Sequence, residues 1–565
     1  MIQLRRLVLL ATLIAPAACA GPSAPPALVD DGGTMPTSDA GAPPVPTDDA
    51  QIVDPDAGAP IATRSLALRN AGWGRGALVV EGHPPCDAEC TLAIPEGETV
   101  TITAQPGYGQ RADAWGDECA AAEPGGTCTI TMDVDRTASV EWTGGAAVAA
   151  RVIGGAGVQQ VVDVDVASDG DLVLAVEIEG ATTLSDGETR VAYGPSDCLV
   201  VRVSSDASTV RWVARTRGGG REECEDLALG EDDDVFVVGM VTGAFSMGAE
   251  AFTAADFDAF AARIDASGEV LWATRMPSLA AGAEATLDLV VHDDGHVYAS
   301  GYAATGAGMR AAYFVIDAAD GTATTHSLGG TGSAYALAIE LAPDGDLYLA
   351  GNFAYELGSP AVLNAPDDSD AFVLRMSTEG AIAWARKLSG SGQDEVLDVA
   401  VDDDGNVYAV GIFEGTITLP ARPAATTSLG SIDWLVTSFD AAGAPRWSRS
   451  GGGPGVDVVN RIVWAQGDLY VAGQWEGTAT NPATTATSSG HADAYVVRFA
   501  STGNGGRFVR YFQAEGDEWI GGLAVRGDRM IVVGHFDGTS QLGMPADATP
   551  FVSLNRDGLV YLGGS

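Results

Sequence analysis

Positively charged side chains are scarce in this chain. Its 565 residues include 30 Lys and Arg against 76 Asp and Glu, which gives a formal net charge of −46, and Lys387 is the single lysine. Such a surface repels phosphate backbones and anionic lipid headgroups, so we expect no nucleic-acid partner. The charge indicates a highly solvated surface that would attract divalent cations or basic partners.

Long apolar runs and the local motifs of common enzymes are also missing. No stretch beyond the N-terminus reaches the roughly 18 apolar residues of a membrane span. The sequence has no serine nucleophile elbow, zinc-protease motif or phosphate-binding loop, and its six histidines share no common position. We therefore assign no catalytic residue, no metal ligand and no cofactor, and expect a protein without enzymatic activity.

The N-terminus has the features of an export signal. Arg5 and Arg6 precede the apolar run 7–15, and small residues lead to Cys19. Residues 1–19 resemble a bacterial lipoprotein signal peptide, in which Cys19 is lipidated and becomes the mature N-terminus. The resemblance implies an outer-membrane lipoprotein of the bacterial cell envelope, facing the periplasm or the cell surface, that touches the membrane only through its lipid. Ordinary signal cleavage, which would give a secreted protein, is the alternative.

Residues 20–62 are rich in Pro, Ala, Gly and Asp and contain no Lys or Arg. A segment of this composition cannot bury enough apolar surface to offset its ordering entropy. We expect a disordered tether that holds the rest of the chain clear of a membrane.

Residues 63–143 predict a small β domain. The segments GALVVEG, TVTITAQ, CTITMDV and ASVEW alternate apolar and polar residues, as strands do. With its C-x3-C loop, GETVTITAQP and a Trp-Gly pair before the second cysteine pair, the segment resembles the divergent internalin-B-type bacterial repeat domain. That family is extracellular, small and usually not enzymatic. We expect the disulfides Cys86–Cys90 and Cys119–Cys128, with a four-cysteine zinc site as the alternative.

Residues 147–565 carry a sevenfold repeat in which an apolar strand follows an Asp/Gly turn. The seven copies are SDGDLVLAV, EDDDVFVVG, HDDGHVYASG, APDGDLYLAG, DDDGNVYAVG, AQGDLYVAG and VRGDRMIVVG. A fixed period with four predicted strands per unit favours an all-β fold, a seven-bladed β-propeller. GNVYAVGIF followed by DWLVTSF and a Trp resembles the SBBP family of bacterial propeller repeats. The repeat region opens with an extra strand, VAARVIGG, that resembles a fourth strand, and it ends with LVYLGG in the same role. We expect one of the two to close the ring by completing a unit with strands from the other terminus.

Two further cysteines, Cys198 and Cys224, lie in the first and second units. Setting Cys19 aside for the lipid leaves six cysteines, which suggests three disulfides in an exported protein. We expect Cys198–Cys224 to join the first two units, and free thiols are the alternative.

An acidic column recurs seven residues before the turns. It consists of Asp163, Asp226, Asp288, Asp398 and Asn460, and Ala338 and Ile520 interrupt it. We expect these side chains at one rim of the central channel, where they accept backbone hydrogen bonds and tie neighbouring units together. A cation-binding ring is the alternative.

For the turns DDDGN, PDGD and SDGD we expect ordinary hairpins, with calcium binding as the alternative. The Trp residues of the fourth strands are expected to pack between units.

These features favour a monomeric, lipid-tethered scaffold that binds a protein or glycan partner. A secreted hydrolase or lyase at the channel mouth is one alternative, because propellers also support such enzymes. A structural or adhesive surface protein is the other.

Overall fold

A computed structural model describes residues 62–564 of this chain. The exceptions are residues 73–75, 87–88, 107–109, 145–148, 359–361, 423, 481–484, 504–506, 513–514 and 541–550. The predicted signal peptide, Cys19 and all but the last residue of the predicted tether lie outside the described residues. Within the described part of the chain, no helix is long and apolar enough to cross a membrane.

The first seven strands form two facing sheets, one ordered β3-β1-β7-β5 and one ordered β2-β4-β6. Alternating burial along β4 and β6 places every second side chain in a shared core that includes the fully buried Trp142. The bounds are β1 (Thr63–Gly72), β2 (Gly76–Val80), β3 (Cys90–Pro95), β4 (Thr99–Pro106), β5 (Gln110–Asp117), β6 (Thr127–Thr131) and β7 (Arg136–Gly144).

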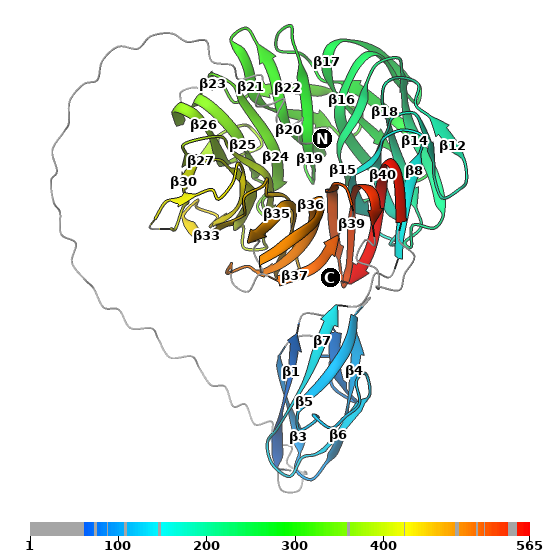
Figure 1. Cartoon of the computed structure of the whole chain (residues 1–565), viewed down its shortest axis with the longest axis vertical. Coiled ribbons are helices and arrows are strands. Elements are labelled where there is room, and N and C mark those ends of the chain that lie inside the picture. The colour runs from blue at the N-terminus through cyan, green and yellow to red at the C-terminus, as the bar shows by residue number, and fades with distance from the viewer. Residues whose placement is uncertain are drawn as a thin grey trace, which may run out of the picture. The chain divides into compact units, whose positions relative to one another are not determined.

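The rest of the described chain forms four-stranded antiparallel units, numbered one to seven here (Figure 1). Unit one contains β9 (Gln159–Val166), β10 (Leu172–Ile178), β13 (Asp197–Val203) and β14 (Val210–Gly218). Unit two contains β15 (Glu222–Leu229), β16 (Val235–Met247), β17 (Glu250–Ile264) and β18 (Val270–Arg275). Unit three contains β19 (Glu284–His292), β20 (His296–Thr305), β21 (Gly308–Asp317) and β22 (Ala323–Ser327). Units four and five contain β24 (Ala334–Leu341), β25 (Leu347–Leu357), β26 (Leu363–Met376), β27 (Ile382–Gly390); β28 (Asp394–Val401), β29 (Val407–Phe413), β32 (Asp433–Phe439), β33 (Pro445–Gly451).

Units six and seven complete a closed cycle. They contain β34 (Val458–Ala465), β35 (Asp468–Thr480), β36 (Thr485–Ala500), β37 (Arg507–Phe512); β38 (Glu518–Arg526), β39 (Arg529–Ser540), β40 (Phe551–Gly564), β8 (Ala149–Gly155). Short strands in the connections are β11 (Ala181–Thr183), β12 (Thr189–Val191), β23 (Gly330–Thr331), β30 (Thr416–Thr418) and β31 (Thr426–Thr427). The first strands of successive units are neighbours around the ring, and β38 of unit seven contacts β9 of unit one.

The last unit joins the two ends of the repeat region. Its order is β38-β39-β40-β8, so the N-terminal segment containing VAARVIGG supplies the fourth strand. The assignment of LVYLGG to a fourth strand is therefore wrong. Leu559 to Gly564 belong to β40, which pairs with β39 as the third strand. Strand pairing between the two ends closes the ring.

A β-bulge accompanies the glycine that ends six of the seven repeat copies, and the first copy has Val176 at this position. Gly411 on β29 faces β28 where the pairing register shifts between Val396 and Asp398. A Cβ atom at Gly411 would lie 1.9 Å from the Glu395 carbonyl oxygen, closer than any side chain allows. Glycine at this point therefore permits the close approach of two backbones that the bulge requires.

The connections of each unit lie at two ends. We call the end with the first-to-second and third-to-fourth strand turns the turn end. The other end, which carries the second-to-third strand connections and the links between units, we call the loop end.

Candidate functional site

Four acidic side chains occupy equivalent positions on the first strands of units one, two, three and five. In each unit the residue lies directly after the bulge, as the strand registers of β9, β15, β19 and β28 show. We call this group the channel acids; it consists of Asp163, Asp226, Asp288 and Asp398. The structure thus brings together four members of the acidic column predicted from the sequence.

The channel acids connect each unit to the next one. Asp288 accepts hydrogen bonds from its own neighbour Leu289 N–H (2.8 Å) and from Ile339 N–H of unit four (2.8 Å). Asp226 accepts a bond from the Leu289 N–H of unit three at 3.0 Å, and Asp163 accepts one from Leu227 of unit two at 3.4 Å. This arrangement agrees with the inter-unit tie proposed from the sequence, because it satisfies backbone donors that would otherwise be buried without a partner.

The sixth position of the ring differs from the sequence-based assignment. The register of β34 with β35 pairs Val459 with Gly473 and, after the bulge, Arg461 with Ala472. Arg461, and not Asn460, is thus equivalent to the channel acids. The Asn460 amide instead donates to the Ile520 carbonyl of unit seven at 2.8 Å.

The seventh position is held by a glycine. Gly522 follows the bulge of β38, where the sequence count had placed Ile520. A Cβ atom at Gly522 would lie 2.7 Å from an oxygen of Asp163, so the absence of a side chain lets the last unit approach the first.

Burial and mutual repulsion control the protonation of the channel acids. Burial raises the pKa of Asp163 to about 7 and that of Asp398 to about 8, and the Arg461 guanidinium opposes both shifts. Burial, followed by the charges of Asp163 and Asp288, raises the pKa of Asp226. Placing several ionised carboxylates together in a low-dielectric site is unfavourable, so burial and mutual charge favour the protonated forms.

A cavity of about 340 Å³ opens among the first strands of units two to six, and its lining includes Asp288, Glu340 and Asp398. Burial raises the pKa of Glu340 to about 7 as well. In the described part of the chain, no group of three or more His, Cys, Asp or Glu side chains is placed to hold a metal ion. The carboxylate oxygens that would ligate a cation in such a ring accept backbone hydrogen bonds instead.

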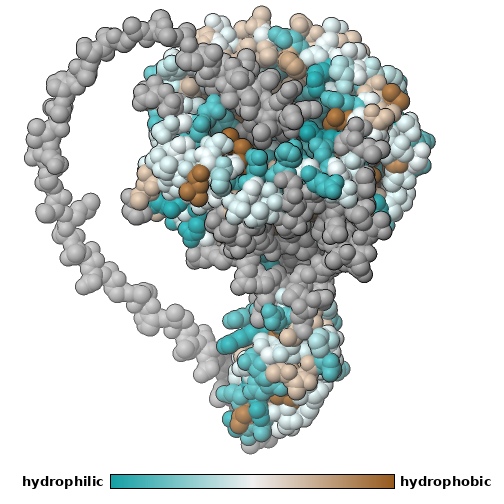
Figure 2. All heavy atoms as spheres, viewed as in Figure 1, coloured by the Kyte–Doolittle hydropathy of each residue, from teal (hydrophilic) through white to brown (hydrophobic). Residues whose placement is uncertain are grey.

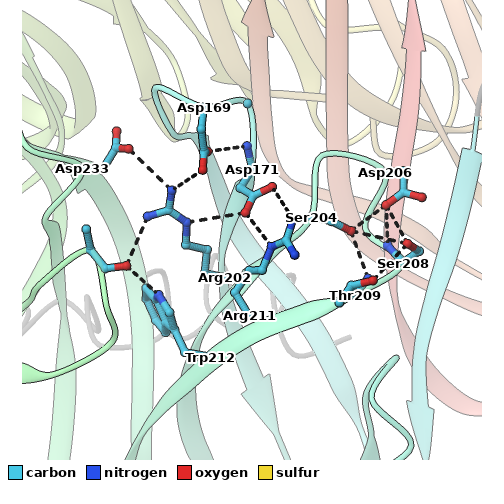
Figure 3. A network of polar contacts seen from close by, with 12 residues as sticks. Asp169, Asp171, Arg202, Ser204, Asp206, Ser208, Thr209, Arg211, Trp212 and Asp233 are labelled. Atoms are coloured by element: carbon cyan, nitrogen blue, oxygen red, sulfur yellow. Dashed lines mark hydrogen bonds and ion pairs between the residues drawn. The ribbon is translucent and has the colours of Figure 1, made fainter.

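At the turn end, a second set of polar contacts crosses from unit one to unit two (Figure 3). Arg202 on β13 forms ion pairs with Asp169 (3.1 Å) and Asp233 (3.5 Å), which belong to the turns of units one and two. It also donates to the Ala266 carbonyl of unit two, which receives the indole N–H of Trp212 at 3.0 Å. These contacts join unit one to unit two.

The same Trp and Arg arrangement recurs around the ring. Trp272 and Arg263 both donate to the Ala318 carbonyl, and Trp384 and Arg375 both donate to the Ala441 carbonyl. The fourth-strand Trp residues thus pack between units, as expected, and also make a directional hydrogen bond. Sequence reasoning missed the arginine partners, although an Arg recurs five residues after the Asp that begins many third strands.

A third set of contacts lies at the loop end, where the third strand of one unit meets the first strand of the next. Asp197 and Glu222 are both fully buried there, and Arg215 pairs with Asp197. Burial, then the Asp197 charge, raises the pKa of Glu222 to about 8. Equivalent buried pairs follow at four further junctions, with the residues Asp258 and Glu284, Asp370 and Asp394, Asp433 and Asp457, and Asp493 and Glu518.

The junction of units three and four departs from this pattern. Arg310 takes the place of the aspartate and Ala334 that of the facing acid. The Arg310 guanidinium donates to the Gly330 carbonyl (3.2 Å) and to the Gly332 carbonyl. At other junctions the aspartate accepts backbone N–H groups of its own long loop, as Asp433 does from Leu429 (2.9 Å). Unit three lacks that loop. At its junction with unit four, the Arg310 guanidinium, bonded to the carbonyls of Gly330 and Gly332, stands in place of the aspartate.

The structure pairs all six described cysteines. Cys86 is bonded to Cys90 and Cys119 to Cys128 in the small domain. Cys198 on β13 is bonded to Cys224 on β15 with a Cα–Cα distance of 5.3 Å, so this disulfide joins units one and two. The four cysteines of the small domain are therefore disulfide-bonded in pairs, which leaves no thiolate to bind zinc.

The turn aspartates bind their own backbone. Asp402 accepts hydrogen bonds from the Asp404 and Asn406 N–H groups at 3.1 and 2.8 Å. Asp265 and Asp440 do the same in the third-to-fourth strand turns. Such Asx-type bonding is the usual function of Asp in a turn and uses the oxygens that calcium would need.

Comparisons with known proteins do not place the chain in a family. No family model matches the chain. The regulatory protein FlaEY of Caulobacter vibrioides is 26% identical over 208 residues, which cover 35% of this chain and only 22% of FlaEY. This distant match covers about a fifth of that protein.

Solved structures that align with much of the chain do so at low identity and low TM-score. Sqt1 of Chaetomium thermophilum is 11% identical with a TM-score of 0.35, covering 89% of this chain and 97% of Sqt1. YCF48 bound to a D1 peptide is 8% identical with a TM-score of 0.35, covering 73% of this chain and 94% of YCF48.

Proposed function

We propose that this protein is a lipid-tethered scaffold of the bacterial cell envelope that binds a protein or glycan partner and does not catalyse a reaction. In this proposal the repeat region is a seven-bladed β-propeller of the SBBP type, and the small cysteine-bearing domain is a bacterial repeat domain of the divergent internalin-B type. The predicted lipid at Cys19 and the predicted tether at residues 20–62 would hold both near a membrane.

The distribution of exposed apolar side chains carries the binding part of the proposal. Nine large apolar residues are exposed in the described chain, and seven of them lie at the loop end of the repeat units. These seven are Val191, Tyr193, Phe257, Leu279, Tyr355, Val362 and Leu429. On the face shown in Figure 2, strongly hydrophobic colour is limited to small, separate patches. Exposed apolar residues concentrated at one end favour a contact surface there.

The use of the acidic groups favours a non-enzymatic function. A hydrolase or lyase needs a carboxylate or another base that is free to exchange a proton with substrate. The channel acids instead accept backbone hydrogen bonds from the neighbouring unit, as Asp398 does from Ile462 at 2.8 Å. Their raised pKa values follow from burial and mutual charge, which structural networks produce as readily as active sites do.

Two measurements test the proposal. Radioactive palmitate should label the wild-type protein in bacteria and should fail to label Cys19→Ser. A photo-crosslinking residue at Tyr193, which is 56% exposed at the loop end, should capture a partner in the envelope. The same residue at Leu271, which is 48% exposed on a fourth strand, should not. Equal capture at both positions, or cleavage of envelope polysaccharides by the purified protein, would contradict the proposal.

A further inference from the structure

Glu340 lies on β24 of unit four, two residues beyond the channel position that Ala338 occupies. Its pairing with Tyr348 makes it equivalent to Asp165 on β9, which pairs with Val173. The other five units carry apolar residues at this position, namely Ala228, Val290, Ala400, Val463 and Ala524. A carboxyl is therefore present at this level of the channel in only two of the seven units.

The two carboxyls differ in their hydrogen-bond partners. Asp165 accepts the N–H of Val166 on its own strand (2.7 Å) and that of Leu229 on unit two (3.1 Å), so it ties two units together as the channel acids do. One oxygen of Glu340 accepts the N–H of its own neighbour Leu341 at 2.8 Å. Among the described residues, its other oxygen has no hydrogen bond and no ion pair. The Glu340 carboxyl therefore makes no bond that joins unit four to another unit.

Glu340 borders the cavity of about 340 Å³ in the central channel. Most of the lining is apolar and includes Leu229, Val290 and Leu341. It extends from the level of Asp288 toward the turn ends of the first strands. Cavities of roughly 300 Å³ or more that combine apolar walls with a few polar groups are typical of small-molecule sites.

The charge of Glu340 has no cationic partner. The Arg461 guanidinium opposes the raised pKa of Asp288 and that of Asp398. The pKa of Glu340 is raised by burial and by the charge of Asp288, and the bond from Leu341 N–H is what opposes this rise. Within the described part of the chain, no Lys or Arg is paired with this carboxyl. An acid-lined cleft with low-dielectric walls concentrates cations.

The acceptors that remain free in the cavity suit an ammonium group better than a metal ion. Both oxygens of Asp288 accept backbone N–H groups, and so do both oxygens of Asp398. Calcium takes roughly six to eight oxygen ligands, which carboxylates engaged in this way do not supply. An alkylammonium group has about three N–H donors, so Glu340 and one or two further oxygens are enough for it. Its alkyl chain can lie against Leu229 and Val290, which line the same cavity.

We propose that the cavity binds a primary alkylammonium ion, with the ammonium group on Glu340 and the alkyl chain against the apolar wall. This site lies toward the turn end and is separate from the exposed apolar residues of the loop end, so the inference goes beyond the proposed scaffold function. A free amine and a lysine side chain of a partner present the same chemical group, and the test distinguishes these two sources.

The test is isothermal titration calorimetry on the whole chain at pH 8 and low salt, with hexylamine as the probe. Burial raises the pKa of Glu340 to about 7, so its carboxyl is mostly ionised at this pH while the amine is protonated. Hexylamine should bind saturably, with a Kd of about 1 mM or tighter. Hexanol and hexanoate have the same chain length without the positive charge, and they should bind at least about tenfold more weakly.

Three substitutions locate the site. Glu340→Gln keeps the size of the side chain and removes its charge, and it should weaken hexylamine binding at least about tenfold. Val290→Phe fills the cavity and leaves Glu340 intact, and it should also weaken binding. Glu379→Gln removes a charge at an exposed turn of unit four that does not line the cavity, and it should leave binding unchanged. Thermal unfolding by circular dichroism establishes that each variant is folded.

A capped lysine, Nα-acetyl-lysine methylamide, distinguishes the two sources of the ammonium group. Tighter binding of hexylamine would identify a free amine as the ligand, and tighter binding of the capped lysine would identify a lysine side chain of a partner. In either case Glu340→Gln should weaken the binding.

Several results would overturn the inference. These are no binding of hexylamine to the wild type, equal binding by the wild type and Glu340→Gln, or equal binding of hexylamine and hexanol. Displacement of hexylamine by an equal concentration of Ca²⁺ would also overturn it, because a metal ion would then be the preferred ligand. None of these results affects crosslinking at Tyr193 of the loop end, so the scaffold function stands or falls separately.

Discussion

The Asp398 carboxylate accepts the N–H of Val399 on its own strand at 2.7 Å and the N–H of Ile462 on the next unit at 2.8 Å. One side chain thereby satisfies two buried backbone donors in two different units. We expect Asp398→Ala to lower the free energy of unfolding by about 2 to 4 kcal/mol, because both donors lose their partner. Urea unfolding followed by tryptophan fluorescence measures this.

The exposed turn residue Asp403 provides the control for that substitution. Asp403→Ala should change stability by less than about 0.5 kcal/mol. If Asp398→Ala unfolds at the same urea concentration as Asp403→Ala, the channel acids do not tie the units together.

Stability should depend on pH in the direction opposite to that of most salt-bridged proteins. The folded-state pKa values of Asp163, Glu222 and Asp398 are raised to about 7, 8 and 8, against unfolded values near 4. Between those limits the folded state binds more protons than the unfolded state, so the free energy of unfolding falls as pH rises. We expect full stability from these groups below about pH 4 and its progressive loss between about pH 5 and 8.

Urea midpoints measured across this range at constant ionic strength test the pH dependence. Arg461 faces the channel acids and limits the shift. Arg461→Gln should therefore steepen the loss of stability toward pH 8. A midpoint that rises from pH 5 to 8 in the wild type would contradict the expected protonation of the buried acids.

The disulfide between Cys198 and Cys224 closes a loop with a sequence separation of 26 residues. On the chain-entropy estimate, a loop of this length stabilises the folded state by about 3 kcal/mol. Replacing both cysteines with Ala should lower the free energy of unfolding by roughly that amount. In reducing buffer, the wild-type protein and this double variant should be equally stable. Thiol labelling of the folded wild type should find neither cysteine free; labelling of either one would show that units one and two are not joined covalently.

Arg310 should be more important for stability than its charge alone suggests. It is buried, and it donates to the carbonyls of Gly330 and Gly332 at the junction where the acid pair is missing. We expect Arg310→Ala to cost about 1 to 3 kcal/mol, because the half-buried carbonyls of Gly330 and Gly332 lose this donor. Arg217→Ala, at an exposed position of unit one, should cost less than about 0.5 kcal/mol. If Arg310→Ala and Arg217→Ala unfold at the same temperature, the hydrogen bonds of Arg310 do not stabilise this junction.

The register of unit six shows where counting along the sequence failed. Its first hairpin turns on Gln466 and Gly467, both with positive φ, so that Ala465 pairs with Asp468. In unit three three residues separate the paired His292 and His296. The shorter turn moves the channel position by one residue, from Asn460 to Arg461. A one-residue shift places the other face of a strand toward the channel, and neither the turn type nor the bulge is visible in a residue count.

The sequence by itself determined the repeat, its four strands per unit, the recurring glycine and the candidate cysteine pairs. These follow from local chemistry: alternating apolar residues, Asp-Gly turns and cysteines at short spacing. Only the tertiary structure decided that Ala149–Gly155 completes the last unit, that Arg461 faces the acids and that Arg310 bonds to Gly330. Each of these depends on which segments meet across a junction between units. Contacts between residues up to several hundred positions apart are set by the packing of the whole ring and leave no mark on local sequence pattern.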